Sequence, residues 1–485
     1  MRTSLMTVSG LSMLLCAGCA VGPDFHKPAS PNVAQYTREV NEAKVDSTTP
    51  TSKWWETLGS TQLNELVAQA FKNNPNIVAA QAALRLAHEN TAAQFGSYFP
   101  QIQGSYSASR QKNAVGTISP TLTSGDALYT LHTAQLNVSY TPDVFGLNSR
   151  QVESMQAQED VQRFQVEATY QTLSANLVGA VIQEAALTEQ VRAVRDIVQT
   201  NEQALAVLRK QQALGYVGAL DVAAQESALV QARLVQPPLM KQLEQTRDLI
   251  AVLLGTSPAN LSAQAISLAD LRLEPNVPLV VPSQLLERRP DVAAAQAQLH
   301  AATAQVGVAI ANRLPQLSIS AVDGGSSTTF SSMFADGNKF WSLTGGLVQP
   351  IWDFGVLKHR QGAAEAALEQ AKAQYQSTVL QAFQNVADCL YAIKHDAQSE
   401  QVALDMERVA KRTLDLTQRQ HELGSVNSLA VLTAQQAYLQ ARLGSIQAKA
   451  GRYLDVVALH QALGGRLAEP ASDIAPQSKI EVHSP

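Results

Sequence analysis

The chain repeats itself, and this internal duplication restricts its fold more than any other feature of the sequence. The segment 74–84 (NPNIVAAQAAL) returns 215 residues later at 289–299 as RPDVAAAQAQL. From Phe145-Gly146 onward the offset is 209 residues, and it holds as far as Leu254-Gly255, which matches Leu463-Gly464. This unit is far longer than a solenoid repeat. We therefore expect two pseudo-symmetric halves of one body.

Each half contains long stretches with the 3.6-residue period of a helix. In 61–96 the apolar residues recur at intervals of three and four, and Pro75 predicts a kink or a short break there. From about residue 146 to Gln212 there is no proline. This stretch predicts a single helix of about 66 residues, about 100 Å long, which is typical of a coiled coil.

A second helix follows the long one and runs back. The glycine-containing segment 214–218 predicts a tight turn. Beyond it we expect a helix of about 35 residues from Leu220 to Leu254, broken or kinked at Pro237-Pro238.

Between the helices the hydrophobic period changes to two, which predicts strands. The expected strands span about 101–111, 131–142, 316–323 and 340–350. Loops rich in Ser, Thr and Gly should connect them at 112–125 and 323–338. Each strand has one apolar face and one small polar face. That pattern fits a barrel strand between lipid and water. Taken singly, the strands favour the alternative of a soluble hairpin with one face on a core, because alternation is a weak signal.

The first 18 residues have the features of an export signal, with Arg2 before the apolar stretch 5–15. Cys16-Ala17-Gly18-Cys19 follows, and Cys19 has two interpretations. It lies near an ordinary cleavage site, or it is the lipidated residue of a bacterial lipobox. Ala20 and Val21 come next without an aspartate, which by bacterial sorting rules predicts an outer-membrane address.

Composition excludes several functions. The net charge of −5 and the pI near 6.0 argue against nucleic-acid binding, which needs a basic face. We expect no cofactor, no metal and no enzymatic activity, since no phosphate loop or metal-ligand spacing occurs. Histidines in the helices, such as His460, are expected at the surface or facing a lumen. Cys389 is the only cysteine outside the signal region, so an intramolecular disulfide is excluded.

The number of strands has a geometric consequence. Four membrane strands cannot close a barrel, because about eight is the smallest number that does. Open sheet edges are not tolerated in lipid. If the strands lie in a membrane, several copies must share one barrel, and three copies would supply twelve strands. Closure alone does not fix the number of copies.

Four segments of the chain match a known family. They are Ala17–Phe25, Trp54-Trp55, Tyr140–Gly146 and the most specific, Leu286–Val292. With them the chain resembles the outer membrane factor family, the TolC-like and NodT-like exit ducts of bacterial efflux systems. It is most similar to the lipoprotein branch that works with resistance-nodulation-division pumps.

The resemblance implies an α+β membrane protein with two pseudo-repeats of helix, strand, strand, long helix and helix. It implies a homotrimer with a 12-stranded β-barrel in the outer membrane and a long α-helical coiled-coil tunnel in the periplasm. The expected segments are a signal peptide at 1–18, a lipid-anchored extended segment at 19–60, repeats at 61–260 and 285–466, a linker at 261–284, and a disordered tail at 467–485.

The resemblance also implies functional residues at the two interhelical turns. The tips that would contact a periplasmic adaptor protein are Leu214, Gly215, Tyr216, Val217, Gly218, Leu423, Gly424 and Ser425. A gate is expected at Asp221, Leu429, Thr433 and Gln436. Asp221 has an alternative interpretation, since an acidic residue in a first helical turn is favoured by the helix dipole.

The second repeat departs from the family pattern. Gate positions that are often acidic correspond here to Ala430 and Thr433. A constriction at Leu429, opened by helix movement, is therefore the better hypothesis for this half than a charged ring.

The leading functional hypothesis is a passive exit duct that works with an adaptor and an inner-membrane pump to release small molecules. A TolC-like duct for peptides or proteins is the alternative within the same class. A lipid-tethered coiled-coil protein that spans the periplasm without conducting is the alternative from another class.

Overall fold

The computed structural model describes residues 20–29, 36–37, 53–112, 128–261, 266–273 and 288–464. The predictions for the signal peptide, for Cys19 and for the tail at 467–485 lie outside these residues, as does most of the expected linker. The chain forms two compact units. Unit 1 is drawn from residues 1–28, 83–162 and 295–375, and unit 2 from 29–82, 163–294 and 376–485.

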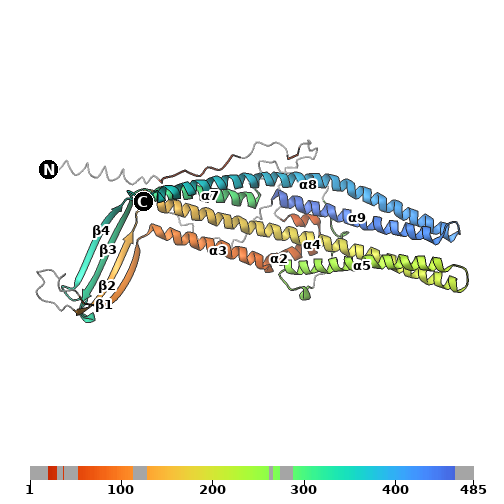
Figure 1. Ribbon diagram of the computed structural model, residues 1–485, viewed down its shortest axis with the longest axis horizontal. Coiled ribbons are helices and arrows are strands. Elements are labelled where there is room, and N and C mark those ends of the chain that lie inside the picture. The colour runs from red at the N-terminus through yellow and green to blue at the C-terminus, as the bar shows by residue number, and fades with distance from the viewer. Residues whose placement is uncertain are drawn as a thin grey trace. The chain divides into compact units, whose positions relative to one another are not determined.

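The order of the elements confirms the duplication (Figure 1). In the first repeat it is α2 (Thr61–Asn73), α3 (Pro75–Phe95), β1 (Gln101–Lys112), β2 (Leu128–Tyr140), α4 (Leu147–Ala213) and α5 (Ala219–Leu253). In the second it is α7 (Pro290–Ala311), β3 (Gln316–Ser327), β4 (Lys339–Val348), α8 (Val356–Glu422) and α9 (Ser428–Leu463). Short 3₁₀ turns are η1 (Trp54–Leu58), η2 (Gly96–Tyr98), η4 (Pro258–Asn260) and η5 (Phe330–Ser332). Of these, η1 is a helical turn inside a segment expected to be extended.

The long helices have the predicted length. Helices α4 and α8 each contain 67 residues. Asp143 caps the start of α4, because its carboxylate accepts the backbone N–H groups of Asn148 at 3.0 Å and Ser149 at 2.8 Å. Asp353 does the same for α8, because its carboxylate accepts the N–H groups of Leu357 at 2.8 Å and Gly355 at 2.9 Å. These two donors lower the pKa of the Asp353 carboxyl. The motif Tyr140–Gly146 thus contains the residue that caps the start of α4.

The two expected proline breaks differ in outcome. A break occurs at Asn74, where α2 ends and α3 begins at Pro75. At Pro237-Pro238, where a break or a kink was expected, there is no break, because α5 runs through both prolines. Each proline removes one helical N–H, but both lie on the exposed side of α5. Water can reach the carbonyls that lose their donors, and packing against α4 keeps the helix together.

In unit 1 the four strands form one antiparallel sheet in the order β1-β2-β3-β4 (Figure 1). The central pair, β2 and β3, joins the two repeats, with Leu136 opposite Asp323 and His132 opposite Ser327. Strand β3 is longer than predicted, since it continues to Ser327 where a loop was expected from residue 323. Pairing with β2 extends it, and Gly324 permits the close approach, because a Cβ there would lie 2.6 Å from the carbonyl oxygen of Ala134.

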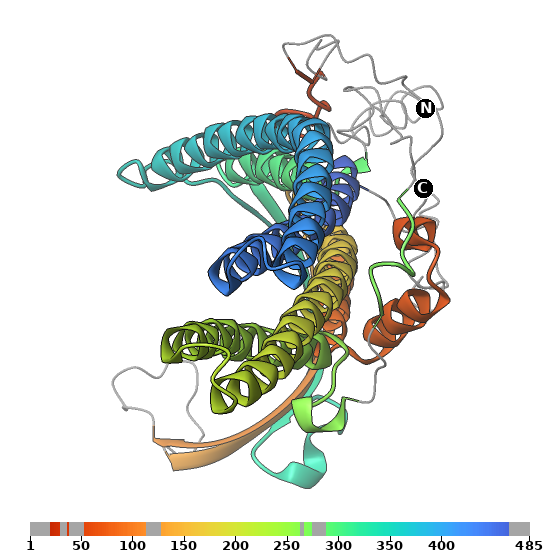
Figure 2. The same cartoon turned by 90° about the vertical axis from the view of Figure 1, so that its right-hand side faces the viewer.

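In unit 2 helix α5 lies antiparallel to α4. The ion pairs Arg209–Glu226, Arg233–Glu202 and Arg247–Glu184 join the two helices at successive levels. Figure 2 shows this pair and the α8–α9 pair from the end where their turns lie.

The core of unit 2 forms where η1 and α2 pack on the middle of α4 and the end of α9. Trp54, Leu63, Leu177 and Tyr453 belong to this buried cluster. The Tyr453 hydroxyl donates to the backbone carbonyl of Leu271 at 2.9 Å. None of the described helices combines the length and the apolar character that a membrane-crossing helix needs.

Candidate channel wall and helical tips

The register of the sheet separates apolar from polar side chains. Residues directly opposite each other in antiparallel strands point to the same face. One face is apolar along all four strands. Its apolar residues include Ile102, Tyr106, Leu136, Val138, Leu317, Ile319, Ala321, Trp341, Leu343 and Leu347.

The opposite face carries mostly small polar and amide side chains, with Leu131, Val322, Phe340 and Val348 among them. The polar residues include Gln103, Ser105, Ser107, Gln135, Asn137, Ser139, Ser318, Ser320, Ser342 and Thr344. These residues bond to one another across the strands. The Asn137 amide donates to Ser105 at 3.2 Å, and the Thr133 and Ser326 hydroxyls are 3.0 Å apart. This face suits contact with water.

Within the described chain, only the segment Phe330–Phe334 lies over the apolar face, at its hairpin end. Trp341, Leu343 and Leu347 are all exposed. A soluble hairpin would bury this face against a core, so the second interpretation of the strands is not supported. Of the charged residues on this face, Arg110, Lys112 and Lys339 lie toward the hairpin ends of their strands. Asp323 lies within the apolar band, directly opposite Leu136 and Trp341. An apolar band with polar ends is the pattern of strands in contact with lipid.

Aromatic side chains mark the two ends of this face. Toward the hairpins, the Tyr106 hydroxyl is 2.9 Å from Nδ1 of His132, and the ring of Phe330 stands nearly perpendicular to both rings. After the end of β4, the exposed rings of Trp352 and Phe354 pack edge to face with centroids 5.9 Å apart. Aromatic rings of this kind are enriched at membrane–water interfaces.

The two turns of unit 2 have the same backbone structure, as the duplication predicts. Helix α4 ends in a Schellman motif. The N–H of Tyr216 donates to the backbone carbonyl of Gln211 at 2.9 Å, and the N–H of Gly215 donates to the backbone carbonyl of Gln212 at 2.9 Å. Helix α8 ends in the same way at Gly424 and Ser425. Gly215 and Gly424 have φ angles of 81° and 75°, which explains why each turn contains glycine at this position.

The returning helices begin with different caps. At α5 the carboxylate of Asp221 accepts from the N–H of Gly218 at 3.3 Å. At α9 the side chain of Asn427 accepts from the N–H of Ala430 at 3.1 Å. The Asp221 carboxylate also accepts a hydrogen bond from the Ser428 hydroxyl at 3.1 Å, which joins the two turns. Asp221 is therefore a helix cap as well as a link between the repeats.

The predicted tip residues are strongly exposed. Leu214, Tyr216 and Leu423 have exposed fractions of 71%, 79% and 81%. Gly215, Gly218, Gly424 and Ser425 are exposed too, and only Val217 is half-buried. Large apolar side chains at a turn cost free energy in water, and they are typical of surfaces that contact another protein.

The predicted gate residues of α9 lie along one side of that helix. Leu429 is exposed, and its carbonyl accepts from the Thr433 hydroxyl at 2.9 Å. One turn further on, the Gln436 amide donates to Gln231 of α5 at 3.1 Å. These three residues line one groove of about 380 Å³ between α4, α5 and α9. Asp221 does not line it.

Amide side chains dominate the polar lining of this groove. Gln231, Gln435, Gln436, Gln440 and Asn201 all contribute. Of these, Asn201 also accepts a hydrogen bond from the buried Gln225 amide at 2.9 Å. Sequence reasoning missed Gln231 and Ser428, because each forms a hydrogen bond with a residue more than 200 positions away. The offset of 209 residues is the one sequence signal that could have suggested such pairs.

Comparisons with known proteins agree with this geometry. The family model described as outer membrane efflux protein matches residues 66–256 and 281–465. The chain is 30% identical over 421 residues to the pyoverdine export outer membrane protein OpmQ of Pseudomonas putida, covering 86% of this chain and 88% of that protein. It is 26% identical to the probable outer membrane lipoprotein SilC of Salmonella typhimurium, covering 96% of this chain and 99% of the relative.

A solved structure has the same fold. The CmeC outer membrane channel of Campylobacter jejuni superimposes with a TM-score of 0.87 at 21% identity, covering 93% of this chain and 96% of that one. The likeness establishes the fold, with its two repeats of strands and long helices.

Proposed function

The chain belongs to the outer membrane efflux protein family, and from this premise we propose that it is the outer-membrane exit duct of a tripartite efflux system. It conducts small molecules passively, while an inner-membrane pump of the resistance-nodulation-division type supplies the energy and a periplasmic adaptor protein joins the two. The sheet with one apolar and one polar face carries this proposal, since such a wall suits lipid on one side and an aqueous passage on the other.

The wall is completed by identical copies of the chain. Strands β1 and β4 are the edges of the sheet, and within the described residues one side of each has no strand partner for its backbone N–H and C=O groups. In lipid these groups need partners, because each unsatisfied group costs several kcal/mol. Pairing β4 of one copy with β1 of the next satisfies them, and three copies make a 12-stranded barrel.

Pairing between the edge strands is directly testable. Cysteines are placed on the polar faces of β1 and β4, at Ser107 and Ser342, with neighbouring positions scanned in a Cys389→Ser background. We expect oxidation to give a covalent trimer on a denaturing gel, and native mass spectrometry to give three chains per particle. A monomer in both measurements contradicts the shared barrel.

The N-terminus is anchored by lipid at Cys19. The sequence Cys16–Cys19 supports this, as does the name of the relative SilC, a probable lipoprotein. Labelling with radioactive palmitate is expected to mark the parent protein and to leave the Cys19→Ser variant unlabelled. Label in both proteins, or in neither, contradicts lipidation at this residue.

The turns Leu214–Gly218 and Leu423–Ser425 contact the adaptor, and the groove beside them closes the duct. Their exposed leucines support the first role. For the second, the amide lining supports a gate held by packing and neutral hydrogen bonds, with Leu429 as the constriction.

Conductance in a planar bilayer tests the duct against a non-conducting coiled-coil protein. We expect small, rare openings from the parent and a large steady conductance from Leu429→Gly. Leu220→Gly is the matched control, because Leu220 is an exposed leucine near the start of α5, as Leu429 is near the start of α9. Absence of conductance in Leu429→Gly, despite a correctly assembled particle, rules out the duct.

A further inference from the structure

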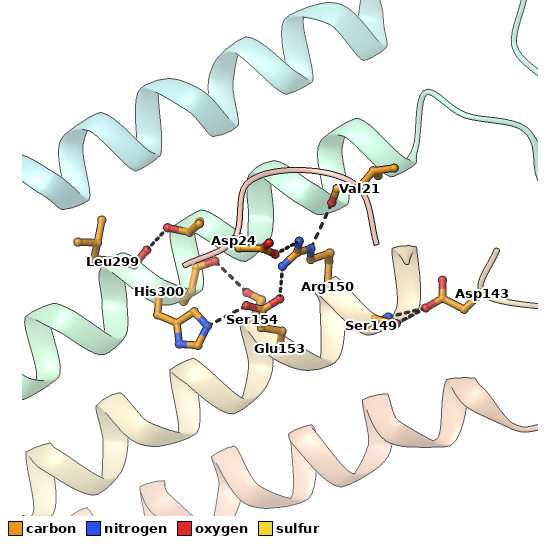
Figure 3. A network of polar contacts seen from close by, with 11 residues as sticks. Val21, Asp24, Asp143, Ser149, Arg150, Glu153, Ser154, Leu299 and His300 are labelled. Carbon is orange, nitrogen blue, oxygen red and sulfur yellow. Dashed lines mark hydrogen bonds and ion pairs between the residues drawn. The ribbon is translucent and has the colours of Figure 1, made fainter. Parts of the chain in front are cut away.

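The N-terminal segment Ala20–Phe25 lies in a fitted position on unit 1. Figure 3 shows it passing over α7 and α4, with Arg150 of α4 beneath it. The Arg150 guanidinium donates to the carbonyl of Val21 at 3.2 Å and forms an ion pair with Asp24 at 2.6 Å. The side chain of Arg150 is only 6% exposed, so the segment and the helices together enclose this charge.

A second carboxylate holds Arg150 in place from below. Glu153 accepts from Arg150 at 2.7 Å, and its other oxygen is 2.8 Å from Nε2 of His300 on α7. The ring of His300 in turn stacks on Phe25 of the segment with centroids 4.3 Å apart. The residues Arg150, Glu153 and His300 thus form one connected network that includes helices of both repeats. The segment contacts this network twice, through Asp24 at Arg150 and through Phe25 at His300.

Backbone fit adds to these contacts. A Cβ on Gly22, whose φ is 96°, would lie 2.5 Å from Cα of Gly307 on α7. A Cβ on Gly146, at the turn between β2 and α4, would lie 2.6 Å from Cα of Ala20. The N–H of Val21 donates to the carbonyl of Phe145 at 3.2 Å. A segment held only by chance contacts would have no need of glycines on both surfaces.

We propose that Ala20–Phe25 is a docking strap, that the surface of α4 and α7 around Arg150 is its binding site, and that Arg150 is the positioning residue. The docked strap fixes the chain beside Gly146, directly after β2. A lipid attached to the residue before Ala20 is then joined to the chain close to the end of β2, and not through a freely moving segment. This consequence rests on the proposed lipidation of Cys19, whereas the docking itself does not.

Distances between spin labels test the docking. Labels are attached at His26→Cys and Val144→Cys in a Cys389→Ser background, and labelled chains are diluted with unlabelled chains so that pairs are intramolecular. Both positions are exposed, and both belong to unit 1. We expect one narrow distance distribution, because the strap holds residue 26 in a fixed place. A broad distribution in this parent overturns the proposal.

Two variants of the strap should release it. Asp24→Ala removes the ion pair with Arg150, and Gly22→Ala places a Cβ against Gly307. Each should lower the ratio of docked to undocked chains by about tenfold or more. For Asp24→Ala the reason is the loss of a hydrogen bond between charged groups, which is among the strongest in proteins. For Gly22→Ala the reason is the overlap of the new Cβ with the backbone of Gly307. Pro23→Ala is the control, because it changes an exposed residue of the strap and removes neither the charge nor the glycine. Unchanged distributions in both Asp24→Ala and Gly22→Ala overturn the proposal.

The strap and the lipid are separated by repeating the measurement in the Cys19→Ser protein. We expect the same narrow distribution there, because the binding site is made by the chain's own residues. A strap that docks only in lipidated protein contradicts this. Palmitate labelling and conductance are measured on the same samples, so that failure of the lipid anchor or of the duct is recognised independently of the strap.

Discussion

The Ser428 hydroxyl donates a hydrogen bond to the carboxylate of Asp221 at 3.1 Å, and these residues lie in the first turns of the returning helices of the two repeats. Asp221 uses its other oxygen to cap α5 at Gly218. One carboxylate thus stabilises a helix start and ties the two turns together. Capping and gating are not exclusive roles for this residue.

Removing the Ser428 hydroxyl should loosen the turns without unfolding a helix. Ser428→Ala leaves the Asp221 cap and the Asn427 cap in place, and it deletes one hydrogen bond to a charged acceptor, worth about 1.5–3 kcal/mol before solvent exposure is allowed for. We expect a higher open probability in planar bilayers, by severalfold. Asn427→Ala is the control, since it removes a cap of similar strength but not the link. Equal conductance of Ser428→Ala and the parent contradicts a gating role for the link.

The duplication made the turns predictable from the sequence. Three glycines of the first repeat have a positive φ angle, namely Gly146, Gly215 and Gly255. Each has a counterpart 209 residues later that is also a glycine with a positive φ angle. A pattern that occurs twice in one chain is a strong signal, because local chemistry fixes it at both places. The long proline-free helices were predictable for the same reason.

Other features depend on residues that are distant in the sequence. The length of β3 is set by pairing with β2, so alternation alone ended the strand at residue 323 instead of Ser327. The strap was recognised as part of a family motif, but its partner Arg150 lies 126 residues away from Asp24 and has no signature of its own. His460 is buried against Trp54 instead of exposed, since a helical period does not reveal which aromatic ring will cover a histidine.

A charge on the lipid side of the sheet should prevent insertion, while the same charge on the water side should be tolerated. Leu343 and Thr344 are neighbours on β4 and point to opposite faces. Leu343→Arg should cost about 2–4 kcal/mol if the site lies near the membrane centre, and less toward the interface. Thr344→Arg should assemble normally and shift the ion selectivity of the pore toward anions. The measurements are the yield of heat-modifiable trimer in outer-membrane fractions and the reversal potential in a salt gradient.

Two glycines with similar φ angles should differ in their response to alanine. Gly424 has a φ of 75° and open space around it, so Gly424→Ala should cost about 1–2 kcal/mol from the left-handed backbone alone. Gly255 has a φ of 74°, and a Cβ there would lie 2.4 Å from the carbonyl oxygen of Asn73. Gly255→Ala should therefore lower the apparent unfolding temperature several times more. Equal shifts in a thermal melt would show that close packing at Gly255 is unimportant.

Two titratable groups on α9 have pKa values displaced in opposite directions. Burial lowers the pKa of His460 to about 4, where its ring stacks on Trp54 at 5.2 Å. Burial and the nearby Asp396 carboxylate raise the pKa of Asp455 to about 6. Folding therefore favours neutral forms of both groups, and it changes their proton uptake with opposite signs.

The pH dependence of stability should show this opposition. Between about pH 4 and 6.5 the unfolded chain protonates His460 and the folded chain does not, so acid removes up to about 3 kcal/mol of stability. Between about pH 3.8 and 6 the folded chain holds a proton on Asp455, so stability falls as pH rises, by about 1–2 kcal/mol after solvent screening. The parent should thus have a shallow profile from pH 4 to 6. His460→Gln should make its apparent unfolding temperature fall with rising pH in that window, and Asp455→Asn should make it rise more steeply. Parallel profiles for the three proteins would contradict both assignments.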